Sequence, residues 1–250
     1  MGEYNTVFRR YEKKFLLDGK QYRAFCKRIE PYMQVDEYGE STICNIYYDT
    51  DDYQLIRSSI DKPVYKEKLR LRSYGTPKYG DTVFLEIKKK YKGIVYKRRV
   101  AMKLEDAYQS LQTGHMTGAD GQISNELEYF MQRYSLHPGT FLAYDRTALY
   151  GKEDPELRMT FDKRIRSRQQ NMGLEQGDYG TLLLPEDQVV LEVKVAEAYP
   201  FWLVRILEDL KIYPASFSKY GNVYTKYILP NLLAQKNNED KGEELCFKVS

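Results

Sequence analysis

Lysine and arginine occupy every second position in several short segments of this 250-residue chain. The clearest of these segments is Lys66–Arg72, whose sequence is KEKLRLR. Side chains two residues apart on a β-strand point to the same side of the strand, about 6.5–7 Å from each other. We therefore expect Lys66–Arg72 to be a strand with one cationic face and one face that carries Leu69 and Leu71.

The same alternation occurs in other segments that we expect to form strands. In Phe84–Lys90 and Val190–Lys194, apolar residues alternate with charged residues in the same way. Lys13, Lys89 and Arg98 fall on the opposite faces and are expected to lie outside. The charged residues predicted to share the cationic faces are Lys14, Lys68, Arg70, Arg72, Lys88, Lys97, Arg99, Arg146, Arg158 and Lys194, together with the carboxylates Glu12, Glu86 and Glu192.

Two interpretations of these faces are open. In the first, ordinary two-sided antiparallel sheets expose them to solvent. In the second, the strands close into a barrel and the cations face a common interior. So many like charges would repel one another there, and their removal from water adds to the cost, unless a polyanion compensates them. A chain of phosphates would be such a polyanion, and the few glutamates would then be oxygen ligands for Mg²⁺ or Mn²⁺.

The rest of the sequence predicts an α+β protein. Its 24 tyrosines favour strands, because aromatic side chains suit a half-buried pleated surface. We expect one domain over residues 1–235 and a polar tail over 236–250, with Asp18 and Ser124 as helix N-caps. The expected strands cover 41–49, 64–74, 82–90, 94–103, 140–150, 157–166 and 188–195, and the expected helices cover 18–30, 52–60, 104–111, 124–136, 201–210 and 218–233.

Composition and motifs narrow the function classes. The formal net charge is only +3, which disfavours a general polyanion binder and makes the position of the cations decisive. Two histidines, His115 and His137, leave almost no material for a histidine metal site or a Ser-His-Asp triad. Neither G-x-x-x-x-G-K-[ST] nor G-x-G-x-x-G occurs, so a P-loop or Rossmann enzyme is disfavoured. An RNA-binding sheet would need exposed aromatic residues on the cationic face, and 68–72 and 86–90 carry none there.

Cysteine usage and hydropathy bear on the compartment. Cys26, Cys44 and Cys246 lie far apart and show no C-x-x-C spacing, which is typical of reduced thiols in a cytoplasmic protein. No run approaches the ~18 apolar residues that cross a bilayer, and the N-terminus has no signal-peptide core. We expect a cytoplasmic protein without a membrane segment of its own, so that any coupling to export would need a membrane partner protein.

A series of motifs in a fixed order resembles the triphosphate tunnel metalloenzyme, or CYTH-like, superfamily. Within it, the order and spacing are most similar to the catalytic domain of the vacuolar transporter chaperone (VTC), the polyphosphate polymerase branch. The resemblance runs from about Arg10 to Tyr227. The motifs are Glu12-x-Lys14, Lys68-x-Arg70-x-Arg72, Glu86-x-Lys88, Lys97-x-Arg99, Tyr144-x-Arg146, Arg158-Met-Thr-Phe-Asp162, Glu192-x-Lys194 and Phe217-Ser-Lys219-Tyr.

The resemblance implies an antiparallel eight-stranded β-barrel tunnel with helices outside, ATP as phosphoryl donor and a polyphosphate chain that grows through the tunnel. It also implies Mn²⁺ or Mg²⁺, with Glu192 as the principal ligand and Glu12 and Glu86 as further candidates. The residues expected to take part in catalysis are Lys14, Arg70, Arg72, Lys88, Arg146, Arg158 and Glu192, and those expected to bind phosphate or ATP are Lys68, Lys97, Arg99, Lys194, Ser218, Lys219 and Tyr144.

Several of these roles stay open at the level of sequence. Tyr144 is expected either to stack on an adenine or to pack in the core. Lys97 and Arg99 fit an exposed hairpin face equally well. Glu12 fits an ion pair with a neighbouring cation as well as it fits a metal, and Lys219 fits an ordinary helix surface.

One departure from the superfamily pattern favours phosphoryl transfer to polyphosphate over hydrolysis. The superfamily opens with E-x-E-x-K, whereas this chain has Arg10 at the first acidic position. One carboxylate fewer lowers the capacity to bind metal and to activate water, which a hydrolase needs. A polyphosphate end is already an oxyanion, so its transfer needs no general base. We expect a polymerase that moves the ATP γ-phosphate onto polyphosphate and releases ADP; the alternatives are a tripolyphosphate or nucleoside triphosphate phosphohydrolase and a polyphosphate- or inositol-phosphate-binding module without turnover.

Overall fold

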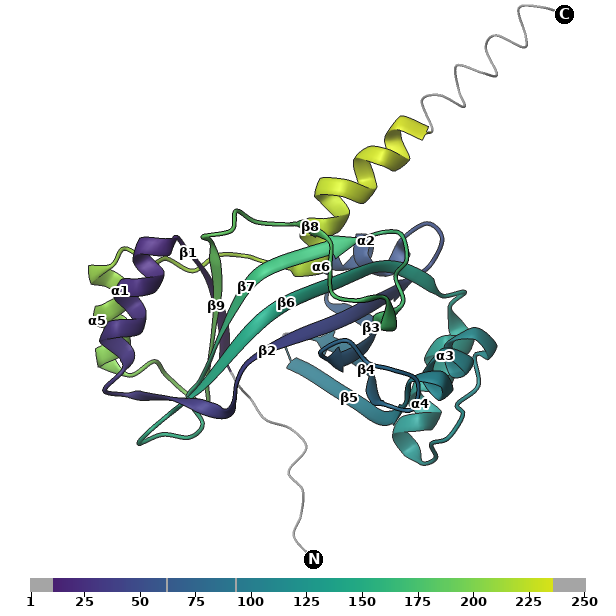
Figure 1. Cartoon of the computed structure of the whole chain (residues 1–250), viewed down its shortest axis with the longest axis horizontal. Helices are drawn as coiled ribbons and strands as arrows, with labels where there is room; N and C mark the ends of the chain where they lie inside the picture. Colours follow the sequence, from purple (N-terminus) through teal and green to yellow (C-terminus); the bar gives the residue numbers. More distant parts are fainter. Residues whose placement is uncertain (1–10, 62, 93, 236–250) are drawn as a thin grey trace, which may run out of the picture.

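The computed structural model describes residues 11–61, 63–92 and 94–235. Its main element is one curved antiparallel sheet with helices on its outer surface (Figure 1). The strands are β1 (Tyr11–Leu17), β2 (Met33–Asp49), β3 (Tyr65–Tyr74), β4 (Thr82–Tyr91), β5 (Ile94–Lys103), β6 (His137–Gly151), β7 (Arg158–Arg168), β8 (Thr181–Leu182) and β9 (Val189–Val195). The helices are α1 (Gly19–Ile29), α2 (Gln54–Ile60), α3 (Leu104–Thr113), α4 (Gln122–Arg133), α5 (Phe201–Asp209) and α6 (Lys219–Val223), with a 3₁₀ turn at Leu174–Gln176 and a π-helical turn at Tyr224–Ile228.

The strands pair in the order β1-β9-β7-β6-β2-β3-β4-β5, and β8 is added to β7. This large antiparallel sheet with inserted helices confirms the α+β class. In the described part of the chain no backbone pairing joins β1 to β5, so closure of the sheet into a barrel stays a prediction. The edge of β1 is met instead by a later segment, because the N–H of Ala215 donates to the carbonyl oxygen of Lys14 at 2.7 Å.

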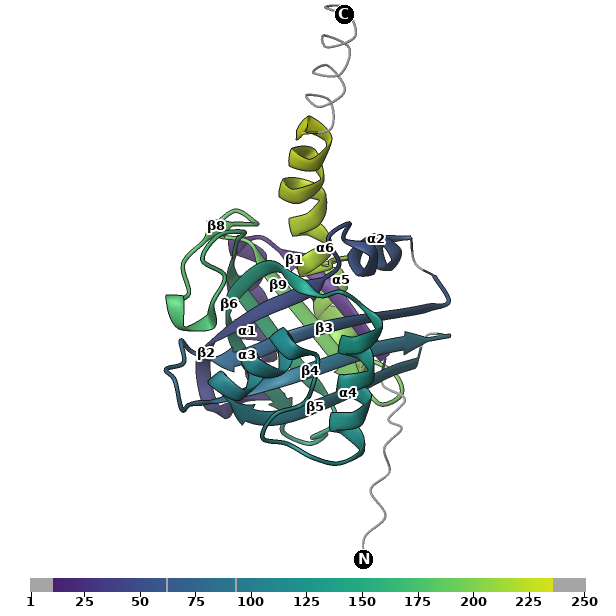
Figure 2. The same cartoon turned by 90° about the vertical axis from the view of Figure 1, so that its right-hand side faces the viewer.

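Helices α1, α3, α4 and α5 lie against the convex side of the sheet, whereas α2 and α6 lie at one end of it (Figures 1 and 2). Leu69 of β3 and Leu85 of β4 are fully buried in one apolar cluster with Phe130 of α4. At the other end of the sheet, Leu191 of β9 is buried in a second cluster with Phe25 of α1. Because strand side chains alternate, burial of these residues on the outside turns their neighbours toward the concave side.

The first helix follows its sequence signals, whereas α4 does not begin where it was expected. The side chain of Asp18 accepts hydrogen bonds from the N–H groups of Lys20 and Gln21, and the Gln21 side chain accepts from the N–H of Asp18, so the predicted N-cap is confirmed. Helix α4 begins at Gln122 after Gly121, and Ser124 lies buried within its first turn. The prediction of Ser124 as the N-cap is therefore wrong.

The closing helix begins after Ser218, as expected, and continues to residue 235. The π-helical turn at Tyr224–Ile228 interrupts it just before Pro230. Proline has no N–H and its ring collides with the carbonyl of the preceding turn, which disfavours regular α-helical hydrogen bonding at this point. None of the helices among the described residues is long and apolar enough to cross a membrane. Arg10, Cys246 and the expected tail 236–250 lie outside the described residues.

Candidate functional site

The strand registers place the predicted cations on one face of the sheet. On β3 to β5, Lys68 lies opposite Lys88, and Lys88 lies opposite Lys97. At the other end, Arg158 of β7 lies opposite Lys194 of β9. We call this concave surface the cationic face; it carries Lys14, Lys68, Arg70, Arg72, Lys88, Lys97, Arg99, Arg146, Arg158 and Lys194, with Glu12, Glu86, Asp162 and Glu192 among them.

The cations predicted to lie outside are outside. Lys89 of β4 and Arg98 of β5 each form an ion pair with Glu126 of helix α4, at 3.7 and 3.8 Å. Lys13 lies over the ring of Tyr199, which is not on the cationic face. Neighbouring residues of one strand therefore have opposite surroundings, a helix for Lys89 and the cationic face for its neighbour Lys88.

Glu86 is the centre of one ion cluster. Its carboxylate lies 2.6 Å from Arg70 Nε, 2.7 Å from Lys97 Nζ and 3.8 Å from Arg72 Nε. Glu86 is only 1% exposed, and although burial opposes its charge, these cations lower its pKa to about 2. Three cations surround Glu86 and its side chain is only 1% exposed, so it fixes the position of Arg70 and has no open side for a metal ion and its waters.

Asp162 is the centre of a second ion cluster, and sequence reasoning assigned it no role. Its two carboxylate oxygens accept from Nε and Nη2 of Arg146 at 2.6 and 2.8 Å, and the Lys219 ammonium donates to the same carboxylate. Burial opposes its charge, but Lys219 and Arg146 lower its pKa below the usual range. Asp162 therefore ties Lys219, after β9 in the chain, to Arg146 on β6. Its position on the same strand face as Arg158 is the sequence signal that could have revealed it.

Glu192 and Glu12 are the carboxylates of the cationic face whose side chains stay partly accessible, with exposed fractions of 10% and 31%. Both lie near Lys14 Nζ, Glu192 at 3.6 Å and Glu12 at 3.5 Å, and Glu192 also pairs with Lys194 at 2.7 Å. Burial opposes ionisation of Glu192, but Lys194 and Lys14 hold its pKa well below the usual range. Glu192 is thus ionised at any physiological pH.

The residues around Glu192 fit a hydrated divalent cation. The described residues contain no cluster of three or more His, Cys, Asp or Glu side chains that could enclose a metal. Mg²⁺, however, is commonly held by one or two carboxylates together with substrate phosphates and several waters. Thr160, directly opposite Glu192 on β7, has a buried hydroxyl without a hydrogen-bond partner among the described residues. A buried hydroxyl of this kind calls for a partner, and a metal-bound water would supply one.

One tyrosine and one asparagine, Tyr47 and Asn45, extend the site beyond the predicted residues. Tyr47 accepts from Arg70 Nη1 at 3.3 Å, while Arg72 donates to Asn45 Oδ1 at 2.9 Å and to the Tyr144 hydroxyl at 3.2 Å. Burial would raise the pKa of Tyr47, but Arg70 and its neighbours lower it to about 8. These contacts hold both arginines in place, and sequence reasoning did not single out Tyr47 or Asn45.

Tyr144 is not available for stacking on a base. Its side chain is buried, with an exposed fraction of 2%. The guanidinium of Arg146 and the ammonium of Lys219 both lie over its ring, at 5.1 and 4.4 Å from the centroid. Of the two roles left open for Tyr144, packing with a polar hydroxyl end is the one that this geometry supports.

The segment before α6 reaches the cationic face from one end (Figure 2). The Phe217 carbonyl accepts from Lys14 Nζ at 3.4 Å, and the Ser218 hydroxyl accepts from Lys68 Nζ at 3.5 Å. Lys219 completes the contact through Asp162. The structure thus brings Ser218 and Lys219 to the other predicted residues, whereas Arg158 is exposed at the rim and donates to the Pro155 carbonyl at 3.0 Å.

Burial, together with nearby cations, lowers the pKa values of Lys68 and Lys88. Burial lowers the pKa of Lys68 to about 8, and the nearby charges of Lys66, Lys88 and Lys14 act in the same direction. Burial also lowers the pKa of Lys88. Neither Lys68 nor Lys88 forms an ion pair with a carboxylate of the described residues. Their positive charge is therefore available to a bound anion.

Anion affinity is expected to depend on pH through Lys68. Below pH 8 this ammonium is charged in the free protein and attracts an anion; above pH 8 it is increasingly neutral, so the affinity falls. Titration calorimetry with tripolyphosphate between pH 7 and pH 9 would measure this fall. In Lys68→Arg, whose guanidinium stays charged, we expect a smaller fall. An equal fall in both proteins would contradict this assignment.

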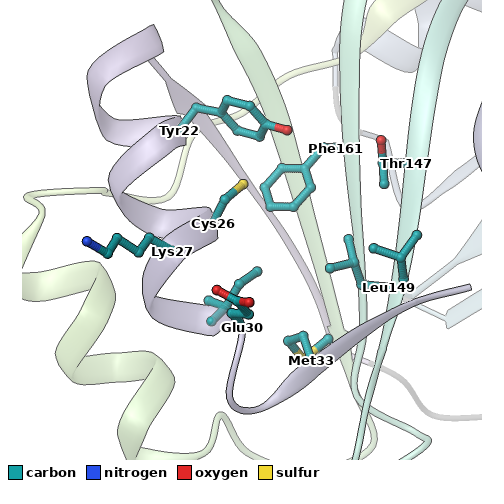
Figure 3. Close-up of a pocket in the computed structure, with 10 residues that line it drawn as sticks. Tyr22, Cys26, Lys27, Glu30, Met33, Thr147, Leu149 and Phe161 are labelled. Atoms are coloured by element: carbon teal, nitrogen blue, oxygen red, sulfur yellow. The ribbon is translucent and has the colours of Figure 1, made fainter.

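A cleft on the outside of the sheet is separate from these residues. It has a volume of about 350 Å³ and lies between α1 and the outer side of β2, β6 and β7 (Figure 3). Apolar and polar side chains line it, including Tyr22, Cys26, Leu149 and Phe161. No residue of the cationic face lines this cleft.

This chain is similar to one family of proteins in sequence and to several solved structures in fold. The family model of the VTC domain matches residues 9–228. No curated protein matched the sequence. Among solved structures, a candidate adenylate cyclase from Bacillus halodurans has a TM-score of 0.53 at 15% identity, covering 83% of this chain and 92% of that one. At this identity the likeness shows the fold alone.

Two further structures are more distant. A candidate adenylyl cyclase from Hippeastrum, described as having a dominant triphosphatase activity, has a TM-score of 0.49 at 14% identity, covering 86% of this chain and 94% of that one. A candidate adenylate cyclase from Vibrio parahaemolyticus has a TM-score of 0.44 at 13% identity, covering 88% and 99% of the two chains.

Proposed function

This chain belongs to the VTC domain family, and we propose that it is a metal-dependent polyphosphate polymerase. It would transfer the γ-phosphate of ATP to the end of a growing polyphosphate chain and release ADP. The observation that carries the proposal is the cationic face, to which strands from both ends of the sheet contribute lysine and arginine. Such an array needs a compensating anion with many charges, and a chain of phosphates has them.

Two arginines of the cationic face are oriented before any substrate binds. Glu86 holds Arg70, and Asp162 holds Arg146 through two hydrogen bonds. Preorganised cations of this kind stabilise the charge that develops on a transferred phosphoryl group and lose little freedom when it binds. Arg70 and Arg146 would therefore bind the reacting phosphates, and Lys68 and Lys88 would attract the polyphosphate.

The chemistry of the acceptor supports transfer over hydrolysis. Phosphoryl transfer depends on positioning and on charge neutralisation more than on covalent help from the protein. The end of a polyphosphate is already an oxyanion, so no general base is required, and the described carboxylates of the face are engaged with cations. Hydrolysis would require a group that orients and activates water.

Glu192 and Glu12, with the phosphates of the substrate, would hold Mg²⁺ or Mn²⁺. A divalent cation bound there would neutralise charge on the reacting phosphates. The hydroxyl group of Thr160, opposite Glu192, would form a hydrogen bond with a water molecule bound to this cation. The ammonium group of Lys14 lies within ion-pair distance of both carboxylates.

We also propose that the two ends of the sheet enclose the phosphates as a tunnel. Glu12 and Lys14 of β1 lie close enough to Lys88 of β4 to influence its pKa, although these strands are far apart in the order of the sheet. This electrostatic proximity supports the proposal that β1 faces β4 across the interior. A cytoplasmic location fits the use of ATP and the unpaired thiols of Cys26 and Cys44, and export of the product would require a membrane partner.

A product assay distinguishes the proposed activity from its alternatives. The protein is incubated with ATP and Mn²⁺ or Mg²⁺, and products are followed by ³¹P NMR and gel electrophoresis. We expect long-chain polyphosphate together with ADP, and no product when EDTA is added. Free phosphate without polymer would indicate a phosphohydrolase, and no conversion of ATP would indicate a binding module.

A further inference from the structure

An aromatic pair lies at one end of the cationic face, on strands β3 and β4. Phe84 is on the same side of β4 as Glu86, and it lies directly opposite Arg72 of β3. Tyr74, two residues after Arg72, is 54% exposed and meets the Phe84 ring edge to face, with centroids 5.7 Å apart. The guanidinium of Arg99 from β5 lies over the Phe84 ring at 4.8 Å from its centroid. Together they form a platform of two rings and one planar cation, which we call the aromatic platform.

The distance of the aromatic platform from the ion clusters suits a nucleoside. Successive side chains on one strand face are about 6.5–7 Å apart, so Tyr74 lies two steps, about 13 Å, beyond Arg70 along β3. In a nucleoside triphosphate, the base is separated from the terminal phosphate by the ribose and two further phosphates. A terminal phosphate held near Arg70 would thus leave the base close to Phe84 and Tyr74.

The opposite end of the same strands is unsuited to a base. There the side chains on the face are Lys66, Lys68 and Lys90. Ammonium groups bind phosphates well but provide no flat surface for stacking. The strands β3 to β5 therefore have a polarity, with aromatic rings at one end and lysines at the other.

We propose that Phe84, Tyr74 and Arg99 form a stacking site for the base of the nucleotide donor. The proposal rests on the proposed use of ATP by the cationic face. Bases stack on aromatic rings and on guanidinium planes whatever their identity. We therefore expect little discrimination among bases, with purines bound more tightly than pyrimidines because their stacking area is larger.

The experiment compares a ligand that has a base with one that has none. Affinities for ATP and for tripolyphosphate are measured by titration calorimetry without metal, for the wild type and for Tyr74→Ala and Phe84→Leu. Tyr74 is exposed, and leucine keeps an apolar side chain at Phe84, so both variants are expected to fold. We expect ATP to bind about 5- to 100-fold more weakly to the variants, as loss of one stacked base predicts, and tripolyphosphate to bind within about twofold of the wild type.

Two control variants make the comparison specific. Tyr91→Ala removes an exposed ring of β4 that also has a cation over it, Lys92 at 5.4 Å, but on the other side of the strand. Tyr150→Ala removes a ring from the face at the far rim, opposite Arg158. Both are expected to bind ATP as the wild type does.

The outcomes separate this proposal from the proposed function. Equal weakening of ATP and tripolyphosphate binding in Tyr74→Ala and Phe84→Leu, or no weakening of either, would overturn the stacking site, as would a selective loss of ATP binding in Tyr150→Ala. Because binding is measured without turnover, the comparison holds whether or not polymer forms. Absence of polymer from a protein that shows the selective loss would refute the polymerase and leave the stacking site standing.

Discussion

Glu192→Gln is expected to reduce polyphosphate formation by about 10²–10³-fold, the usual cost of removing one group that stabilises transition-state charge. The amide keeps the size of the carboxylate but is a much weaker ligand for Mg²⁺ or Mn²⁺. Binding of tripolyphosphate is expected to be unchanged or tighter, because the variant removes a negative charge beside Lys14 and Lys194. A loss of turnover without a loss of binding is the result expected of a metal ligand.

Turnover is measured as ADP release at several metal concentrations, and binding by calorimetry without metal. Glu197→Gln is the matched control, since Glu197 is exposed and lies beyond the end of β9. It should leave both quantities unchanged. Full metal-dependent activity in Glu192→Gln would show that the metal is held elsewhere.

The strand faces could be predicted because the alternation of side chains in a strand is strict. Lys88 and Lys89 are adjacent in the sequence and chemically identical, yet period two assigns one to the face and the other to helix α4. This reasoning placed Lys14, Lys68 and Lys194 on one face without knowledge of the pairing. The same reasoning extends to Asp162, which shares a strand face with Arg158 and was left without a role.

The partners of these cations could not be predicted from the sequence. Whether Glu86 binds a metal or arginines depends on which strands lie next to β4, and this pairing is a property of the whole sheet. Asn45 and Tyr47 look ordinary in β2, and their contacts with arginines of β3 arise only through the register. Closure between β1 and β5 is likewise a question of tertiary structure.

The N-termini of α1 and α4 show how far a capping residue predicts where a helix begins. Asp18 caps α1 because Gln21 completes the reciprocal pair of hydrogen bonds. Ser124 has the same chemical preference, but the chain already turns into α4 at Gly121, so the serine is buried in the first turn. A capping residue in the sequence is thus a weaker constraint than the packing of Leu127 and Phe130 into the core.

Two adjacent lysines, Lys88 and Lys89, allow a test of whether the concave side of the sheet binds the phosphate chain. Lys88→Glu places a negative charge on the cationic face, near Lys14, Arg70 and the predicted phosphate chain. It removes a charge-assisted contact and adds repulsion, so we expect tripolyphosphate affinity to fall by at least ~100-fold. Lys89→Glu makes the same change in net charge on the side of β4 that faces helix α4.

The most direct measurement is therefore the tripolyphosphate affinity of Lys88→Glu beside that of Lys89→Glu, by calorimetry at one pH and one salt concentration. We predict at least ~100-fold weaker binding for Lys88→Glu, with Lys89→Glu within about twofold of the wild type, because Lys89 lies on the far side of the strand, where salt and water screen its charge from the bound anion. Equal affinities of the two variants would contradict a phosphate chain held on the concave side of this sheet.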